Sequence, residues 1–346
     1  MNGRLTRLRT PPSRLQYSPV NFGWASLVLA VASVLTLAAC GGTSSNSAVE
    51  IPAAFGDRQA SGEALANAWF ALLEKTGSAA GVLEVSPDEA ARGAELVKPY
   101  LDPAFQLQRS TGQRYTRESY LPSDIDQFEI SDVRATKPRE GVQVLRYTTR
   151  TPGATLPDQG VVLSDELMPR LTVLRWDDEL GRWLIVSHAN FNTPVQAVCN
   201  QKPIVLNAVE VATPSADREL GEKLVRKFYD LLESGDGRPL MHTEVQGQTA
   251  SGAGYTTVDE YTPGQLKSAN LREFVVTRSG DLLVVSVGTE AQGTVFANST
   301  ELGTKLHPRL LTFMKDEQGE WKLVAIAIFN VPAEVPAGVD CASSTN

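Results

Sequence analysis

Residues 181–194 read GRWLIVSHANFNTP, and residues 319–332 read GEWKLVAIAIFNVP. Both stretches open on a glycine, run as an apolar strand from a tryptophan, and end at Phe-Asn-x-Pro, where proline removes a donor from the strand ladder. Upstream, PRL at residues 169–171 matches PRL at residues 308–310, at nearly the same distance from the tryptophan. The chain therefore contains an internal repeat, which predicts two similar modules.

The first 39 residues differ from the rest of the chain. Four arginines and no acidic residue precede an apolar run from Phe22 to Ala39, which ends in LAAC at residues 37–40. This pattern predicts a signal peptide over residues 1–39. An uncleaved signal anchor is the alternative, because the run is nearly long enough to span a bilayer.

The small residues before Cys40 resemble a bacterial lipobox. The resemblance implies cleavage before Cys40 and its acylation with chains such as palmitate, which makes a membrane surface outside the cytoplasm the first expected partner. The expected location is the cell envelope, and Gly41 favours the periplasmic face of the outer membrane if the cell is Gram-negative. Without the four leader arginines, 28 of the 32 basic residues remain against 40 acidic ones, a net charge of −12. Such an acidic body argues against a nucleic-acid partner.

The chain of 346 residues is 42% hydrophobic and long enough for two domains. We expect a flexible tether over residues 40–56, domain 1 over 57–198, a linker over 199–214, domain 2 over 215–341 and a tail over 342–346. Each domain opens with an amphipathic helix, over about 58–75 and 220–233. A second helix, from an N-cap at Ser86 to Tyr100, is expected in domain 1 alone.

Strands follow the helices in both halves. In domain 1 we expect strands over about 105–108, 128–136, 142–150 and 167–176, followed by the Trp183 strand, with a single helical turn over 115–120. In domain 2 we expect them over about 274–277, 282–287 and 306–314, followed by the Trp321 strand.

Each half resembles an NTF2-like (SnoaL-like) cone domain. The resemblance depends on WFALL at residues 69–73, on FYDLLESGD at 228–236, and on the closing G-x-W-x-[IL]-V strand. It implies an α+β fold of two tandem cone domains, each a curved antiparallel sheet wrapped on helices. Relatives of this kind include cyclases, isomerases and dehydratases as well as non-catalytic binding and assembly modules.

A cavity between helix and sheet is the expected binding place, although core packing is the simpler role for several of its residues. The residues expected to line it are Trp69, Tyr100, Phe105, Tyr115, Tyr147, Trp176, His188, Asn190, Tyr229 and Tyr255. In strict alternation His188 and Asn190 share one strand face and Trp183, Ile185 and Ser187 the other; which face lines the cavity stays open. No metal-ligand spacing is present in the sequence, so neither a metal nor a cofactor is expected.

Two functions remain open at this point. The first is a non-enzymatic envelope lipoprotein that binds a small apolar ligand or an envelope protein. The second is a proton-transfer enzyme that resembles the isomerases and uses His188 or Tyr115, with the Ser86 helix as a lid. Because Ile326 takes the place of His188 in the second copy, no histidine is shared by both halves and the first function is favoured. Cys199 and Cys341 follow the two closing strands, which in an oxidising compartment predicts a disulfide, with two free thiols as the alternative.

Overall fold

The computed structural model describes residues 52–74, 76, 87–123, 125–156, 161–162, 166–191, 204–264, 266–293 and 306–329. The expected signal peptide, the lipidation at Cys40, the N-cap at Ser86 and the Cys199–Cys341 disulfide all lie outside these residues. In the part of the chain that the structure describes, no helix combines the length and the apolar character needed to cross a membrane.

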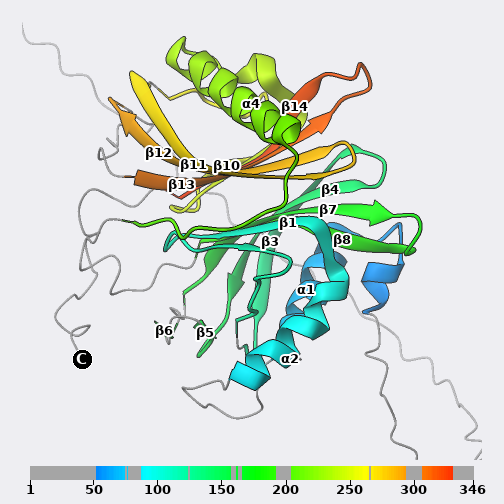
Figure 1. Ribbon diagram of the computed structural model, residues 1–346. Coiled ribbons are helices and arrows are strands. Elements are labelled where there is room, and N and C mark those ends of the chain that lie inside the picture. Colours follow the sequence, from blue (N-terminus) through cyan, green and yellow to red (C-terminus); the bar gives the residue numbers. More distant parts are fainter. Residues whose placement is uncertain are drawn as a thin grey trace, which may run out of the picture. The chain divides into compact units, whose positions relative to one another are not determined.

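Two modules follow one another along the chain (Figure 1). The elements of module 1 are η1 (Ala53–Gly56), α1 (Gly62–Glu74), α2 (Pro87–Val97), η2 (Lys98–Tyr100), β1 (Leu101–Arg109), β2 (Arg114–Thr116), β3 (Glu129–Arg139), β4 (Val142–Arg150), β5 (Thr155–Leu156), β6 (Val161–Val162), β7 (Met168–Asp177) and β8 (Arg182–Asn190). The elements of module 2 are α4 (Ser215–Glu233), η3 (Arg238–Leu240), β9 (Met241–Thr249), β10 (Gly254–Tyr255), β11 (Ser268–Ser279), β12 (Leu282–Gln292), β13 (Leu306–Lys315) and β14 (Trp321–Ile328).

The two modules have the same sheet topology. Module 1 holds a six-stranded sheet in the order β2-β1-β8-β7-β4-β3, and module 2 holds one in the order β10-β9-β14-β13-β12-β11. Each strand of the second sheet occupies the place of its counterpart in the first. The predicted duplication and the α+β class, two cone modules with curved sheets wrapped on helices, are confirmed. The extra helix of module 1 is also present, as α2.

Three expectations about local structure are wrong. The sheets are mixed rather than wholly antiparallel, because β1 runs parallel to β8 and β9 runs parallel to β14. The helical turn expected over residues 115–120 is reduced to a turn over 117–119, because residues 114–116 form strand β2, whose pairing with β1 satisfies their backbone groups. Helix α4 begins at Ser215, directly after Pro214, five residues before the apolar periodicity that predicted it.

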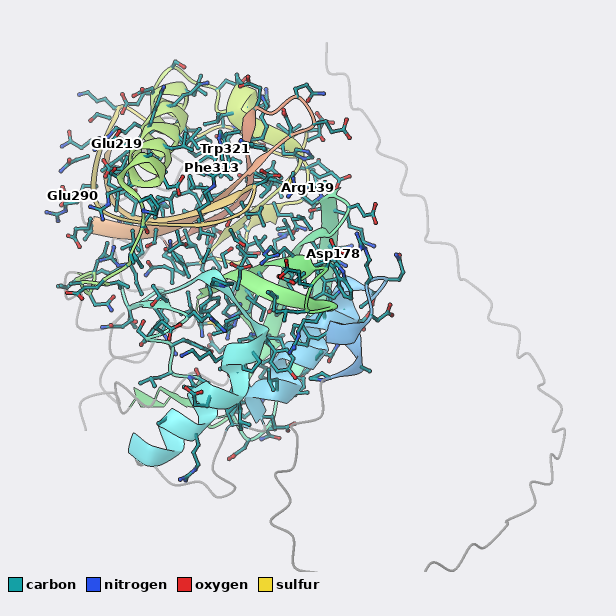
Figure 2. The ribbon with its side chains drawn as sticks, turned by 45° about the vertical axis from the view of Figure 1, so that its right-hand side comes forward. Arg139, Asp178, Glu219, Glu290, Phe313 and Trp321 are labelled. Carbon is teal, nitrogen blue, oxygen red and sulfur yellow. The ribbon has the colours of Figure 1, made fainter. Side chains whose placement is uncertain are left out.

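A glycine lets each long helix lie close to its sheet. A Cβ at Gly62 of α1 would lie 2.6 Å from the Cβ of Ala135, and a Cβ at Gly221 of α4 would lie 2.8 Å from Val276. Both separations are shorter than side chains tolerate. Gly62 precedes Leu65 by three residues, as Gly221 precedes Leu224, so the close approach belongs to the repeat. In module 2, Phe313 belongs to the core cluster that includes residues of α4, and Trp321 packs against this cluster; both are labelled in Figure 2.

The other face of each sheet packs against the other module. A cluster of buried apolar side chains joins the two sheets and is called the shared interface here; it comprises Val142, Val144, Leu171, Val173, Val186, Ala189, Phe191, Leu282, Val284, Leu310, Met314, Val324, Ala325, Ala327 and Phe329. The rings of Phe191 and Phe329 stack at 4.5 Å between centroids, with 23° between their planes. Because these two residues occupy the same place in the repeat, their contact indicates an internal pseudo-two-fold axis near them.

Two glutamines cross the shared interface in opposite directions. The Nε2 of Gln106 lies 3.0 Å from the carbonyl oxygen of Val284, and the Nε2 of Gln246 lies 2.7 Å from that of Val144. The same amide groups also reach the hydroxyls of Thr277, at 2.9 Å, and of Thr136, at 3.1 Å. This reciprocity is the pattern of a symmetric dimer contact, here formed inside one chain.

We expect Gln106→Leu to lower the free energy of unfolding by about 1–3 kcal/mol, because it leaves buried acceptors of module 2 without their donor. Gln246→Leu should have a similar cost, since the contact is reciprocal. Chemical denaturation measures both, and the exposed Gln59→Leu is the control, with a change of about 0.5 kcal/mol or less. A cost for Gln106→Leu no larger than that of the control would contradict this account of the interface.

Candidate functional site

Two rows of polar residues cross the sheet of module 1 on the face that meets α1, which is called the cone side here. In the first row, Arg109 of β1, Asn190 of β8, Arg170 of β7 and Tyr147 of β4 stand in register. The second row lies two residues further along these strands. It places Leu107, His188 and Thr172 side by side. Residues in register on neighbouring strands point to the same face, so the sheet presents both rows to the helix.

A β-bulge decides which residues of β8 reach the cone side. The pairing of β8 with β7 shifts between Val173 and Leu174, so strict alternation fails there. Trp183 and Ile185 belong to the core on the helix side of the sheet. His188 lies on the same side, because its ring contacts Trp69 of α1. Ser187 points the other way and hydrogen-bonds Thr312 across the shared interface. The expectation that Trp183 and Ile185 face away from His188 is therefore wrong. Only Ser187 of that set does so.

Aromatic side chains surround the two rows. Trp69 of α1 lies 6.0 Å from the ring of His188 and 6.3 Å from that of Tyr120. Phe105 and Tyr115 lie 5.5 Å and 6.1 Å from Tyr120. Tyr120 is thus the centre of the aromatic group that contacts His188.

A short hydrogen-bonded chain links three residues of the rows. The hydroxyl of Tyr147 lies 3.0 Å from that of Thr172, which lies 2.8 Å from the Nδ1 of His188. All three side chains are buried. Burial raises the pKa of Tyr147 to about 12, so its phenol stays protonated. The hydrogen-bonded chain can orient the imidazole, and the group that contacts the imidazole directly is the neutral hydroxyl of Thr172.

Positive charge dominates the electrostatics of this group. Burial lowers the pKa of His188 well below 6.5, and the guanidinium groups of Arg170 and Arg109 lower it further. Burial also lowers the pKa of Arg170, to about 10, against the opposing effect of Tyr147. His188 is therefore a neutral imidazole at neutral pH and a weak base, which is unfavourable for proton abstraction.

We expect His188 to make the protein less stable as the pH falls below about 6.5. The unfolded chain binds a proton there and the folded chain does not, so the stabilisation is complete above the unfolded pKa and is lost below it. The loss reaches about 1.4 kcal/mol per pH unit from this one group. His188→Gln should remove it, as measured by denaturation at a series of pH values. An unchanged pH dependence in the variant would contradict the lowered pKa.

Several polar atoms on the cone side have no hydrogen-bond partner among the described residues. They include the Nε of Arg109, the Nε of Arg170 and the Nε1 of Trp69. The two terminal nitrogens of Arg109 are 3.4 Å from Ser123 and Leu121, near the limit of a hydrogen bond. Burying such groups without a partner is costly. The described residues therefore leave part of the hydrogen-bonding capacity of the cone side of module 1 unfilled.

Other residues expected in the cavity lie elsewhere. Tyr100 contacts Phe55, with ring centroids 5.0 Å apart, and Trp176 packs against Trp183 at 5.7 Å. These contacts lie in the part of the helix-side core that is beyond the β8 bulge, away from the two rows that contain Arg109, Arg170 and His188. The two tyrosines from the second half, Tyr229 and Tyr255, are in the core of module 2.

Module 2 repeats the scaffold and not the chemistry. Ile326 and Leu311 replace His188 and Thr172, and Ile328 replaces Asn190. The one buried arginine that recurs is Arg309, which stands where Arg170 does. Arg309 donates a hydrogen bond to the hydroxyl of Tyr229, which supports the charge of the guanidinium.

The two arginines of the cone side were missed at the level of sequence. Arg170 lies in a strand whose neighbours are apolar, MPRLTVLRW at residues 168–176, and its match with Arg309 indicated only the repeat. A charged residue in such a strand is a signal of a buried charge, because strands of this composition pack on both faces. Arg109 carries no comparable signal, since it lies at the end of a polar segment.

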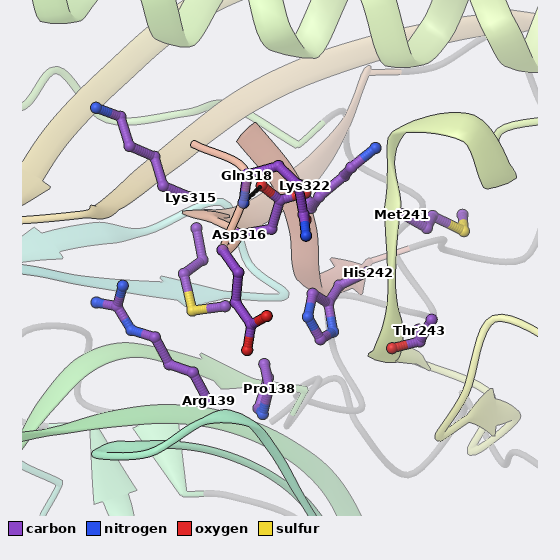
Figure 3. A pocket seen from close by; sticks show the side chains of 11 residues that line it. Pro138, Arg139, Met241, His242, Thr243, Lys315, Asp316, Gln318 and Lys322 are labelled. Carbon is purple, nitrogen blue, oxygen red and sulfur yellow. Dashed lines mark hydrogen bonds between the residues drawn. The ribbon is translucent and has the colours of Figure 1, made fainter. Parts of the chain in front are cut away.

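A separate hollow of about 480 Å³ lies where the β3–β4 turn meets β9 and β14 (Figure 3). His242 borders it, with its Nδ1 accepting the backbone N–H of Glu244 at 3.1 Å. Burial lowers the pKa of His242, while Glu244 and Asp316 oppose the shift. Arg139, at its rim, forms an ion pair with Asp281 at 3.2 Å. The hollow is thus lined by charges of both signs that partly compensate one another.

No family model matches the chain, and no curated protein is significantly similar to it. Among solved structures, an NTF2-like protein from Cytophaga hutchinsonii is 18% identical, covers 32% of this chain and 95% of its own, and has a TM-score of 0.28. A candidate ketosteroid isomerase from Shewanella frigidimarina is 19% identical, with 31% and 93% covered and a TM-score of 0.24. A candidate dehydratase of the NTF2-like family from Streptomyces avermitilis is 18% identical, with 34% and 96% covered and a TM-score of 0.27. Each of these neighbours is about one third as long as this chain.

Proposed function

We propose that the chain is a lipid-anchored protein of the cell envelope that binds a small molecule on the cone side of module 1 without transforming it. Module 2 is its internal packing partner. The observation that carries this proposal is the difference between the modules: on one scaffold, module 1 buries Arg109, His188 and Thr172 on its cone side, whereas module 2 has Thr249, Ile326 and Leu311 in their places. The Nε of Arg109 has no hydrogen-bond partner among the described residues, and this arginine belongs to one copy only. A buried, unsatisfied charge that one copy keeps is better explained by a ligand than by stability, which would favour its loss.

The non-enzymatic part of the proposal depends on His188. Its imidazole is on the helix side of the sheet, as a catalytic base in a cone would be, but burial and two guanidinium groups lower its pKa. A base with a pKa far below the working pH accepts protons poorly. A proton-transfer enzyme remains the second candidate because of the Tyr147–Thr172–His188 chain, and a His188 pKa near 7, measured by NMR, would favour it.

Binding is tested by titrating the protein with small aromatic compounds, namely phenol, aniline, benzamide and benzoate, while recording NMR spectra. We expect at least one compound to shift the signals of Trp69 and Tyr120 and to leave those of Phe313 unchanged. The matched control is Phe228, the counterpart of Trp69 in module 2. Shifts confined to module 2, or none with any compound, would overturn the binding role of module 1.

The anchor is tested separately through Cys40. Intact-mass analysis of native protein should find a chain that starts at Cys40 with added acyl mass, and Cys40→Ser should leave the membrane fraction or remain uncleaved. Cys199→Ser is the matched control and should stay anchored. A native chain that begins at another residue would refute lipidation at Cys40.

A further inference from the structure

The starting observation is the placement of two guanidinium groups on one face of the sheet. Arg109 pairs with Asn190 in the β1–β8 ladder, and Arg170 pairs with the same Asn190 in the β7–β8 ladder. The two arginines therefore stand on either side of one residue, two strand spacings or about 10 Å apart at the backbone. Each is at most 2% exposed. The fold thus holds two cations at fixed positions on either side of the strand that carries Asn190.

These cations are not balanced within the described part of the chain. None of the ion pairs there includes Arg109 or Arg170. Arg170 donates from Nη1 to the carbonyl oxygen of Pro169 at 2.7 Å, and Arg109 lies over the ring of Tyr115 at 5.2 Å. Buried charges in proteins are normally paired, because removal from water is costly for each of them. Two neighbouring guanidinium groups repel one another as well, so an anion between them relieves both effects.

We infer that the ligand of module 1 is a small organic carboxylate whose charged group lies between Arg109 and Arg170 and whose apolar part lies against Trp69 and Tyr120. This inference rests on the proposed function, since it names the class of molecule that the module binds. A planar carboxylate presents two oxygens, which match the paired N–H groups of guanidinium forks. The aromatic side chains next to the arginines favour an organic anion over an inorganic one, because they offer apolar surface to the rest of the molecule.

The second module supplies a matched control. Arg309 stands where Arg170 does and is also buried, at 4% exposure, but the hydroxyl of Tyr229 supports its charge. The position of Arg109 is taken by Thr249, so the second cation is missing. Arg309→Met therefore removes a buried arginine from the same place in the repeat without touching the proposed site.

The experiment is isothermal titration calorimetry with benzoate, its neutral isostere benzamide, butanoate and sulfate. Wild-type protein should bind benzoate at least ten times more tightly than benzamide or sulfate. Arg109→Met and Arg170→Met should each weaken benzoate binding at least tenfold, and Arg309→Met should not. Without ligand, Arg170→Met should melt at the same temperature as the wild type or above it, because it removes an unbalanced charge; this measurement also shows that the variant is folded.

A second readout follows His188 by NMR. Because both guanidinium groups disfavour its protonation, a carboxylate bound between them should raise its pKa, and benzamide should not. If benzamide binds to module 1 as tightly as benzoate does, the inference fails while the proposed binding function stands. If neither carboxylate binds, or if Arg309→Met weakens binding as much as Arg170→Met, the carboxylate site is overturned. If sulfate binds as tightly as benzoate, the inference that the ligand is an organic anion is wrong.

Discussion

Phe329→Ala should lower the free energy of unfolding by about 3–5 kcal/mol, the range found for buried phenylalanines cut back to alanine. Phe329 is fully buried and stacks on Phe191, its counterpart in the repeat, at 4.5 Å between ring centroids. The substitution leaves a cavity where the two sheets meet. Because each sheet buries a face against the other, the loss should destabilise both modules together. Denaturant unfolding followed by signals from each module measures this.

The double variant makes this test specific to the interface. Phe191→Ala and Phe329→Ala remove two sides of one contact, so their combined cost should be smaller than the sum of the single costs. Leu180→Ala, at a side chain 53% exposed, is the control and should change stability by about 0.5 kcal/mol or less. Fully additive costs would mean that the two rings contribute independently. That result would contradict the role assigned to their contact in joining the two modules.

Trp183→Ala should be about as damaging, at roughly 3–5 kcal/mol, while the same change at Trp321 should cost about 1–2 kcal/mol. Trp183 is 2% exposed, donates its indole N–H to the carbonyl oxygen of Asp57 at 2.9 Å, and packs against Trp176. Trp321 is only partly buried, with Arg278 and Lys315 over its ring at 5.7 Å and 5.6 Å. The tryptophan of the repeated motif therefore contributes more to stability in module 1 than in module 2. Thermal or chemical denaturation of the two variants compares them directly, and equal costs would contradict this difference.

The internal pairing also explains why the repeat keeps some residues and not others. Gln106 and Gln246 recur because each satisfies the other module's backbone across the interface. Gly62 and Gly221 recur because each helix must approach its sheet. Arg109, His188 and Thr172 take part in neither contact, and at their positions the two copies differ. A chain that supplies both halves of a pseudo-symmetric pair can keep a binding site in one half while the other half supplies only the packing surface.

Most of the order of helices and strands was predictable from the sequence, since it depends on local signals. Strands β2, β5, β6, β9 and β10 were not expected. The repeat of the closing strand, the 3.6-residue periodicity of Leu65, Trp69 and Leu72, and the turn at residues 138–141 each act over a few residues. Two modules of one fold class follow from these signals together with the recurrence. The parallel pairing of β1 with β8 could not be predicted in this way, because it joins segments that are distant in the chain.

The candidate site was only partly predictable. His188, Trp69, Tyr115 and Tyr147 were expected together, and they do lie on one side of the sheet. A bulge in β8 determined which neighbours face the same way, and a single inserted residue inverts every later position of a strand.

The repeat, the apolar faces and the acidic balance of the body follow from the chain alone, because periodicity and composition are its own properties. That Arg109 and Arg170 share one face, with no ion pair among the described residues, follows from the assembled fold, since the strands that hold them meet through β8. Whether a buried charge is satisfied depends on every segment that packs around it. A pattern read along one strand shows where a charge lies in the sequence, and only the assembled sheets show that nothing in the described chain neutralises it.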